Sequence, residues 1–432
     1  MKVTNVINQK SYYKEILNLA LPAMIENILQ MLMGLVDSYL VAQLGIVAIT
    51  GVSVANNIIS IYQAIYIALA AAVSSLIARS FISESENEQA RKIGESLSLT
   101  IYISLFLGVI TVLFAREMLI SLGTSEQVAQ VGRLYLGVIG GNCFAIGLIV
   151  VLGAIVRANG YPKLPMYVSL LSNIINIILS SLSILVWHYG IIGVATATVI
   201  SRVIACLILI RFLPIKRVIS EFNFKPSKEL LYLSFPTAME RLLMRLGDVV
   251  TIIIVVKLGT KTVAGNAIGE SITQFNYMPG LAMATATIIL VARSELENRS
   301  EQKKLIKQIL WLSSSMMLAI AFVVYIFGKL LSGQFTSDTV VINSSMIVIL
   351  FSLIGSFSTS GTLIYTAVWQ GLGRPKIPLY TTSFGMWVIR IGFGYLLSIP
   401  LKLGLSGVWI ATVLDNTSRW FILKYYYKQK KL

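Results

Sequence analysis

Two stretches of the sequence repeat one another and decide the fold. Residues 22–45 read PAMIENILQMLMGLVDSYLVAQLG, and residues 236–259 read PTAMERLLMRLGDVVTIIIVVKLG. The proline, the glutamate four positions later and the closing Leu-Gly pair align without a gap. Each stretch is also apolar over a length that can cross a bilayer as a helix, which takes about 20 residues.

Two further pairs of motifs occur in the same order and register. GYPKLP at 160–165 recurs as GRPKIP at 373–378, and GIIGVATAT at 190–198 matches GLSGVWIAT at 404–412. Apolar sequence rarely gives three such matches in one order by chance. The chain is therefore predicted to contain an internal duplication.

The composition indicates an integral membrane protein. Hydrophobic residues make up 56% of the 432 residues, and charged residues only 12%, whereas soluble domains carry about 25% charged residues. The formal net charge of +16 comes from basic residues in short breaks between long apolar runs. Since these residues do not cluster beside recognition elements, nucleic-acid binding is excluded.

The apolar runs predict an all-α integral membrane protein with twelve transmembrane helices. These lie near 17–42, 50–78, 96–115, 131–156, 166–187, 190–212, 231–257, 263–291, 308–329, 341–368, 378–399 and 404–423. Because each copy of the repeat has an even number of spans, both copies enter the membrane in the same direction. We therefore expect two pseudo-symmetric six-helix lobes, at 1–213 and 231–432, joined by a cytoplasmic linker at 214–230.

The basic residues also predict the orientation. The termini and even-numbered loops carry 24 Lys and Arg residues, and the other loops carry five. Cytoplasmic loops of membrane proteins are enriched in these residues. We expect a multi-pass protein of the plasma membrane, surrounded by lipid, with both termini in the cytoplasm.

Several motifs resemble the multidrug and toxic compound extrusion (MATE) family. They are the P-x-x-x-E stretch that runs to Asp37, the N-x-x-N pair Asn173 and Asn176, and G-x-G-R-P-K-I-P before the eleventh span. The resemblance covers essentially the whole chain. It implies a secondary active exporter (antiporter), not an enzyme, that moves amphipathic, often cationic drugs or toxic compounds.

The same resemblance implies that inward movement of Na⁺ or H⁺ drives export and that no other cofactor is needed. The sequence has no G-x-x-x-x-G-K-[ST] segment for ATP. We expect a monomer. The alternative is a flippase for a lipid-linked saccharide or other amphipathic lipid of the same wider superfamily.

Asp37 is the foremost candidate for coupling. An ionisable group inside a span is costly, so this carboxylate must take up a proton or hold a cation. Asn173, Asn176 and Ser180 share one face of the fifth span, and Thr198 adds an oxygen from the sixth. The resemblance implies that Asp37, Asn176, Ser180 and Thr198 surround the coupling cation. If that ion is Na⁺, Asp37, Asn176 and Thr198 are its expected ligands.

One position departs from the family pattern, which often has a second aspartate where this chain has Ser180. A single protonatable carboxylate at Asp37 therefore fits H⁺ as well as Na⁺.

The second lobe has a different set of charges. The repeat aligns Asp37 with Thr251, so the anionic centre is not duplicated. Arg245 and Asp248, three residues apart, can pair on one helix face. Charged residues inside a bundle should meet partners. We therefore also expect Arg390 to pair with Glu240 or Asp415.

A drug cavity needs adaptable apolar walls and a few polar groups. The candidate lining residues are Glu240, Met31, Met33, Tyr62, Tyr66, Phe275, Met283 and Arg390.

Pro22 is a candidate hinge in the first span. A proline inside a helix leaves a carbonyl without its donor, here that of Asn18. If the span begins late, however, Pro22 lies in the first turn and has no such effect. The sequence leaves both alternatives open.

Overall fold

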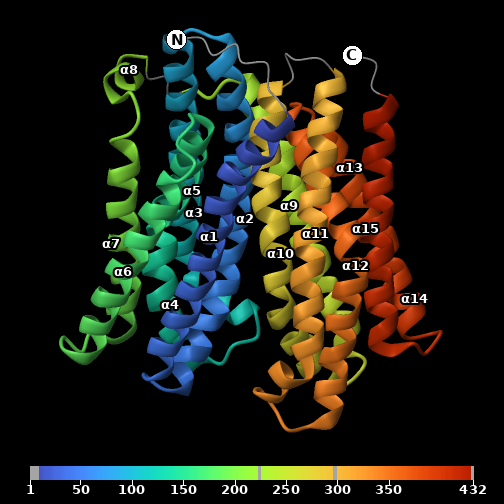
Figure 1. The fold of residues 1–432 in the computed structure, drawn as a ribbon. Helices are drawn as coiled ribbons and strands as arrows, with labels where there is room; N and C mark the ends of the chain where they lie inside the picture. The colour runs from blue at the N-terminus through green and yellow to red at the C-terminus, as the bar shows by residue number, and fades with distance from the viewer. Residues whose placement is uncertain (1–8, 222–224, 295–298, 430–432) are drawn as a thin grey trace. The chain divides into compact units, whose positions relative to one another are not determined.

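The computed structural model describes residues 9–221, 225–294 and 299–429. All regular structure within these ranges is helical (Figure 1). In hydrocarbon no water is available to the backbone, so each segment must satisfy its own peptide groups. A helix meets this requirement within a single span.

Each of the twelve predicted spans coincides with one helix or with helices that follow one another directly. The first half of the chain forms α1 (Gln9–Ala42), α2 (Ile46–Ser83), α3 (Glu86–Ser121), α4 (Glu126–Gly141), α5 (Cys143–Ala158), α6 (Leu164–Leu185), α7 (Gly190–Ile210) and the short α8 (Ile215–Ser220). The second half forms α9 (Lys228–Val256), α10 (Thr260–Ser294), α11 (Arg299–Gly333), α12 (Thr339–Gly371), α13 (Lys376–Phe384), η1 (Gly385–Phe393), α14 (Gly394–Ser398) and α15 (Gly404–Gln429).

Eight of the described helices are long and apolar enough to cross a membrane, and α4 with α5 makes a ninth span. The remaining predicted spans correspond to α9, to the run α13–η1–α14 and to α15. Charged side chains such as Glu240, Arg390 and Asp415 interrupt the apolar sequence of these three. The structure is that of an all-α integral membrane protein.

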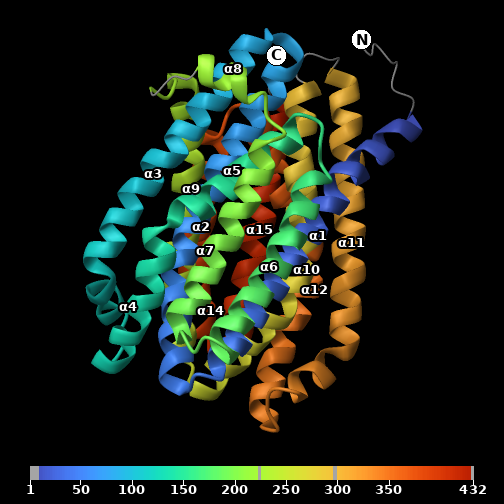
Figure 2. The ribbon, with the colours of Figure 1, turned by 90° about the vertical axis from the view of Figure 1, so that its left-hand side faces the viewer.

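The fourth span is bent, although its sequence predicts one continuous helix. α4 and α5 meet at 44°, on either side of Asn142. The two residues before it are Gly140 and Gly141, where a Cβ would come within 2.5 Å of Thr111 and 2.9 Å of Val112 in α3. Glycine is required for this approach, and it also weakens the helix. Figure 2 shows α3 running beside α4.

The chain divides into two compact units. One contains residues 25–238, and the other contains 1–24 together with 239–432. The divisions fall inside α1 and α9, two residues after Pro22 and two residues after Pro236. Each proline therefore lies where a continuous helix passes from one unit to the other. The lobe boundaries in the linker at 214–230 stay a prediction.

The 25–238 unit packs around α2, whose Tyr62 and Tyr66 are buried in its core. Tyr62 Oη lies 2.7 Å from Thr111 Oγ1, and Tyr66 Oη lies 2.8 Å from Ser104 Oγ. These bonds satisfy the phenolic groups inside an apolar core. The other unit packs α10, α11 and α15 around α12, where Trp369 is buried and donates to the Leu423 carbonyl at 3.2 Å.

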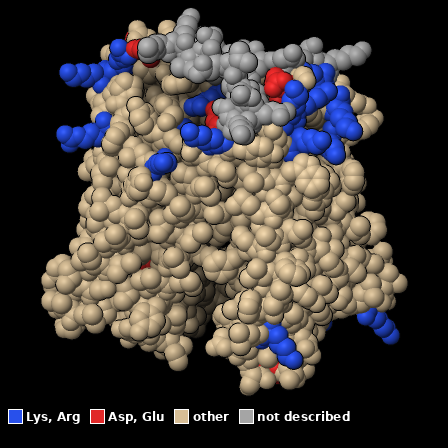
Figure 3. Space-filling view, viewed as in Figure 1, with Lys and Arg blue, Asp and Glu red and all other residues tan. Residues whose placement is uncertain are grey.

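Most of the surface drawn in Figure 3 carries no Lys, Arg, Asp or Glu. In the unit that contains both, α1 begins and α15 ends at the same end (Figure 1). This arrangement is the one expected for a membrane protein with an even number of spans. The predicted cytoplasmic location of the termini stays a prediction.

We expect Gly51→Ala to destabilise the 25–238 unit. A Cβ at Gly51 in α2 would lie 2.9 Å from the Gly132 backbone nitrogen and 3.0 Å from the Val128 carbonyl oxygen. Backbone atoms cannot move without shifting the rest of their helix. We therefore expect the free energy of unfolding to fall by about 1–3 kcal/mol. The control is Gly34→Ala, where a Cβ has no neighbour within 4 Å and helix propensity favours alanine by roughly 0.5–1 kcal/mol. Thermal unfolding of purified protein in detergent measures both, and equal midpoints would contradict the prediction.

Candidate cation-coupling site and buried charge network

Three of the predicted polar residues form one hydrogen-bonded chain between α6 and α7. Ser180 Oγ donates to Asn176 Oδ1 at 2.8 Å, and Asn176 Nδ2 donates to Thr198 Oγ1 at 3.1 Å. Thr198 Oγ1 in turn donates to the Val194 carbonyl at 2.9 Å. Ser180, Asn176 and Thr198 are all buried. The structure thus brings together three residues that the sequence places on two spans.

Asn173 contacts a different helix. Its Nδ2 donates to the Leu29 carbonyl of α1 at 3.0 Å. This bond joins α6 to α1 within the same unit. Asn173 therefore positions the helix that carries Asp37 and does not take part in the Ser180–Asn176–Thr198 chain.

Asp37 lies in α1 with one carboxylate oxygen unsatisfied. Its Oδ1 is buried and has no hydrogen-bond partner among the described residues. The charged group that acts on it electrostatically is Arg202 of α7. Tyr135 of α4, which hydrogen-bonds Asn56 of α2, interacts with both charges.

Sequence reasoning missed Arg202 and Tyr135 as parts of this site. Arg202 follows Thr198 by four residues on α7, and residues at this spacing share a helix face. That spacing was a signal that could have placed Arg202 beside the coupling residues. Tyr135 carried no comparable signal, because nothing in the sequence of α4 relates it to α1.

Glu26 pairs outside the coupling site. Its carboxylate lies 2.6 Å from Arg157 Nη1 at the end of α5, and both side chains are largely buried. Glu26 lies about three turns before Asp37 on α1. It thus ties α1 to the segment that leads into the GYPKLP motif.

The predicted cavity residues divide into two groups. Tyr62, Tyr66 and Met283 are at most 4% exposed and pack inside their own units, which leaves little surface for a ligand. Met31 and Met33 are partly exposed, and Phe275 is 42% exposed. For all six residues, a role in lining a drug cavity stays a prediction.

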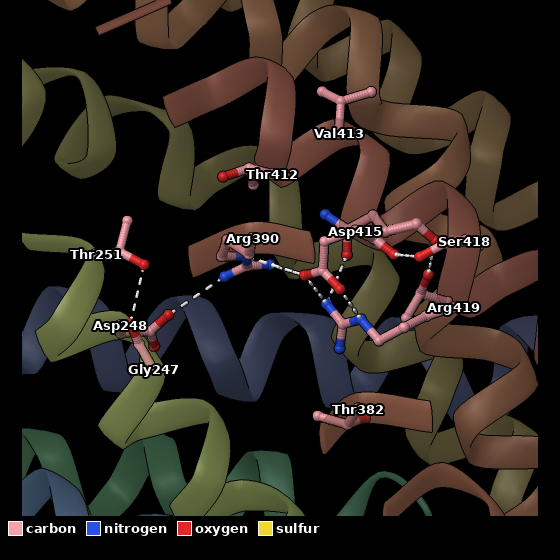
Figure 4. A network of polar contacts seen from close by, with 12 residues as sticks. Gly247, Asp248, Thr251, Thr382, Arg390, Thr412, Val413, Asp415, Ser418 and Arg419 are labelled. Carbon is pink, nitrogen blue, oxygen red and sulfur yellow. Dashed lines mark hydrogen bonds and ion pairs between the residues drawn. The ribbon is translucent and has the colours of Figure 1, made fainter. Parts of the chain in front are cut away.

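The second unit contains a compact network of opposite charges (Figure 4). Asp415 of α15 is fully buried at its centre. Arg390 Nε donates to Asp415 Oδ2 at 2.9 Å, and Arg419 Nε lies 2.8 Å from Asp415 Oδ1. On its other side, Arg390 Nη1 lies 3.3 Å from Asp248 Oδ1 of α9. The four side chains balance to zero net charge.

The predicted pairs are confirmed in part. Arg390 does pair with Asp415, as one of its two expected partners. The Arg245–Asp248 pair is not what forms: Asp248 pairs with Arg390, because the fold brings the eleventh span against α9. Among the described residues, Arg390 pairs with Asp415 and Asp248 and not with Glu240, its other expected partner.

Glu240 is buried beside neutral partners. It accepts hydrogen bonds from Gln370 Nε2 at 3.3 Å and from Thr382 Oγ1 at 3.1 Å, and its exposure is 3%. Its role as a cavity residue stays a prediction.

Arg390 lies in the π-helix η1, which interrupts the eleventh span. A π-helical turn carries an extra residue, so it changes the direction in which the following side chains point. Gly385, where η1 begins, faces the network: a Cβ there would come within 2.3 Å of Asp415 Oδ1. Only glycine permits this approach, and the sequence alone did not reveal it.

Pro22 lies inside α1, well beyond its first turn. The alternative in which the first span begins late is therefore wrong, since the helix already runs at Gln9. In the part of the chain that the structure describes, no group of three His, Cys, Asp or Glu side chains is arranged to hold a metal ion.

The chain is similar to several known proteins. The MatE family model matches residues 22–182 and 236–396, one copy in each half. A probable multidrug resistance protein NorM of Thermotoga maritima is 27% identical, with 93% of this chain and 89% of that protein covered. The uncharacterized transporter YisQ of Bacillus subtilis is 26% identical, with 94% and 92% covered.

Among solved structures, an outward-facing multidrug resistance MATE family transporter matches with a TM-score of 0.89 and 23% identity. The match covers 97% of each chain. The fold is thus that of a membrane transporter built from a duplicated helical unit. The chain belongs to the MatE family, the MATE transporters.

We expect Asp415→Asn to destabilise the protein far more than Asp248→Asn. Loss of the Asp415 charge leaves Arg419 buried without its acidic partner and leaves Arg390 with only the partly exposed Asp248, which costs about 3–5 kcal/mol. The Asp248 side chain is 42% exposed and Arg390 keeps Asp415, so the second change should cost about 1 kcal/mol or less. Chemical unfolding of both variants in detergent tests the difference, and similar losses would show that Asp415 is not the centre of the network.

Proposed function

We propose that the protein is a secondary active exporter of amphipathic, cationic small molecules, driven by inward cation movement through Asp37. Relatives are named multidrug resistance or multidrug export proteins, among them MepA of Staphylococcus aureus at 21% identity. The proposal includes export across the plasma membrane, from the cytoplasm, by a monomer in contact with lipid.

The observation that carries the proposal is the unsatisfied Asp37 Oδ1. A buried carboxylate oxygen without a partner is costly, so the carboxylate gains free energy when it takes up a proton or cation. Asp415 differs, because two guanidinium groups already neutralise it. Unlike Asp415, Asp37 therefore has a carboxylate that is free to change its charge state.

The Ser180–Asn176–Thr198 chain lies on the helices next to Asp37. Its groups are polar but neutral, so they can adjust to either charge state of the carboxylate. Coupling of ion movement to export requires a site whose charge changes on each transport cycle. Here that site lies among groups that stay neutral. Binding at such a site shifts the population of conformations only if the ion prefers one of them.

We expect Asp37→Asn to reduce uphill export at least about tenfold, because a neutral amide cannot alternate between two charge states. The measurement is ethidium efflux from whole cells or inverted vesicles, with Na⁺ and pH gradients imposed separately. Asp338→Asn is the control. The Asp338 carboxylate lies in a loop and pairs with the exposed Lys261 at 2.7 Å. Full efflux by the Asp37 variant at matched expression would end the coupling assignment.

The two helix prolines supply a second part of the proposal. Because α1 is continuous from Gln9, Pro22 leaves the Asn18 carbonyl without its helical donor. Pro236 likewise lies inside a continuous helix, α9. Both lie next to the division between the units, where a bend can change the course of a helix with little disturbance to either packed unit.

We expect Pro22→Ala to slow transport more than Pro236→Ala. α1 carries the proposed coupling acid, Asp37, beyond its proline, whereas the repeat position in α9 is Thr251, whose hydroxyl donates to the Gly247 carbonyl at 2.9 Å. Ion uptake at Asp37 can therefore act on the bend in α1. Transport rates at matched expression, together with substrate affinity, test this prediction. Equal rates for the two variants would contradict a hinge confined to α1.

A further inference from the structure

The start of α11 and the end of α15 lie side by side within one unit. Arg299 Nη2 donates to the Tyr427 and Lys428 carbonyls at 3.5 and 3.3 Å. Tyr427 Oη also donates to Gln302 Oε1 at 3.0 Å. Since one helix begins where the other ends, the two run in opposite directions from this shared end, which is the end predicted to be cytoplasmic.

Four aromatic rings connect the same helices further along. Trp311 of α11 packs edge-on against Phe357 of α12, with ring centroids 6.0 Å apart, and Phe357 packs edge-on against Trp420 of α15 at 5.1 Å. Phe421 lies 5.1 Å from Trp420. Trp311, Phe357 and Phe421 are 59%, 39% and 57% exposed. We call these four residues the aromatic patch. Exposed tryptophan rings of membrane proteins favour the level of the lipid headgroups.

Each outer helix carries a lysine on the side of the patch that faces the shared end. Lys307 precedes Trp311 by one turn of α11, and Lys424 follows Trp420 by one turn of α15. Residues at this spacing share a helix face. Because the helices run in opposite directions, both ammonium groups are displaced from the aromatic patch toward the same end. Rings followed by cations match the order of acyl chains and phosphates in one leaflet of a bilayer.

Lys424 is held in place by the ring beside it. Its Nζ lies 5.1 Å from the centroid of the Trp420 ring, in a cation–π contact. Trp420 is itself fixed, because it packs against Phe357 on one side and against α12 at Gly361, where a Cβ would come within 2.5 Å of the ring. A cation whose position is set in advance loses less conformational freedom when a ligand binds.

The charges of the two lysines are left for a ligand. Lys304 of α11 pairs with Glu301 at 2.9 Å, but neither Lys307 nor Lys424 forms an ion pair in the described part of the chain. Lysine binds phosphate groups as a point charge, and basic residues beside a membrane attract anionic lipids. Charge complementarity therefore favours a phosphate-bearing headgroup at this end of the aromatic patch.

We propose that the aromatic patch, together with Lys307 and Lys424, is a binding site for one anionic phospholipid. The phosphate lies between the two ammonium groups, and the acyl chains lie against the exposed rings. The bound lipid joins α11 to α15 across α12 and so stabilises this unit from its lipid-facing side. The site is separate from the candidate coupling site and does not depend on the proposed transport function.

The test measures stabilisation by lipid. Purified full-length protein in detergent is unfolded thermally with phosphatidylglycerol or phosphatidylcholine added at equal mole fraction. A ligand that binds only the folded state raises the midpoint of unfolding, so phosphatidylglycerol should raise it more than the zwitterionic lipid does. Equal midpoints would overturn the proposal. Inorganic phosphate alone should give no shift, and a full shift would also overturn the proposal, because the ligand would then be a free anion.

The decisive variant combines Lys307→Gln with Lys424→Gln. Its apparent affinity for phosphatidylglycerol should fall at least about tenfold, because both charges that attract the headgroup are gone. Its response to phosphatidylcholine should not change. Lys307→Arg with Lys424→Arg keeps the charges and should retain the response to phosphatidylglycerol. A selective response that survives the loss of both lysines would overturn the proposal.

The matched control combines Lys163→Gln with Lys216→Gln. It removes two exposed lysines from the other unit and should bind phosphatidylglycerol as the wild type does. An equal loss of affinity in this control would show that only net charge matters, which overturns the proposal.

Lys424→Gln alone is a second variant if the double variant does not fold. If neither folds, native mass spectrometry of the wild-type protein in an equal mixture of the two lipids decides. Preferential retention of one phosphatidylglycerol per protein supports the proposal, and retention without preference overturns it. None of these measurements requires export, so their outcome is separate from that of the efflux assay.

Discussion

A charge inside a membrane protein must be neutralised by something else inside the protein, and this constraint governs both units of the chain. In one unit, Arg390 contacts both Asp248 and Asp415, and Arg419 contacts Asp415. In the other, Asp37 Oδ1 and Arg202 Nη1 are buried without a hydrogen-bond partner among the described residues. The proposed coupling role of Asp37 rests on this difference.

The duplication gave both halves the same helices, and later substitutions gave them different chemistry. Thr251 stands where the first copy has Asp37, and its hydroxyl bonds within its own helix. In the second copy, the buried charges lie on α9, η1 and α15, at Asp248, Arg390, Asp415 and Arg419. A buried arginine without a partner is costly, and both of these arginines have an acidic partner. The two copies therefore share their helices and differ in their buried charges.

Departures from regular helix occur where the charged or close-packed groups need them. The bend between α4 and α5 follows two glycines that allow α3 to approach. The π-helix η1 carries Arg390 and begins at Gly385, the residue against which Asp415 packs. Of the prolines inside helices, Pro22 and Pro236 lie beside the division between the units. Irregular backbone thus marks the positions where helices meet, where charge is held or where one unit gives way to the other.

The sequence by itself determined the helical class, the twelve segments, the duplication and the shared helix face of Asn176 and Ser180, because hydrophobicity and helical periodicity are local properties of the chain. It also indicated that Arg390 needs an acidic partner. Only the tertiary structure decided that Asp248 pairs with Arg390 instead of Arg245, that Tyr62 and Tyr66 pack in a core, and that Arg202 and Tyr135 stand near Asp37. These depend on contacts between helices far apart in sequence. Apolar helices can pack in many registers, and the sequence of one helix does not specify which side chain of another it will meet.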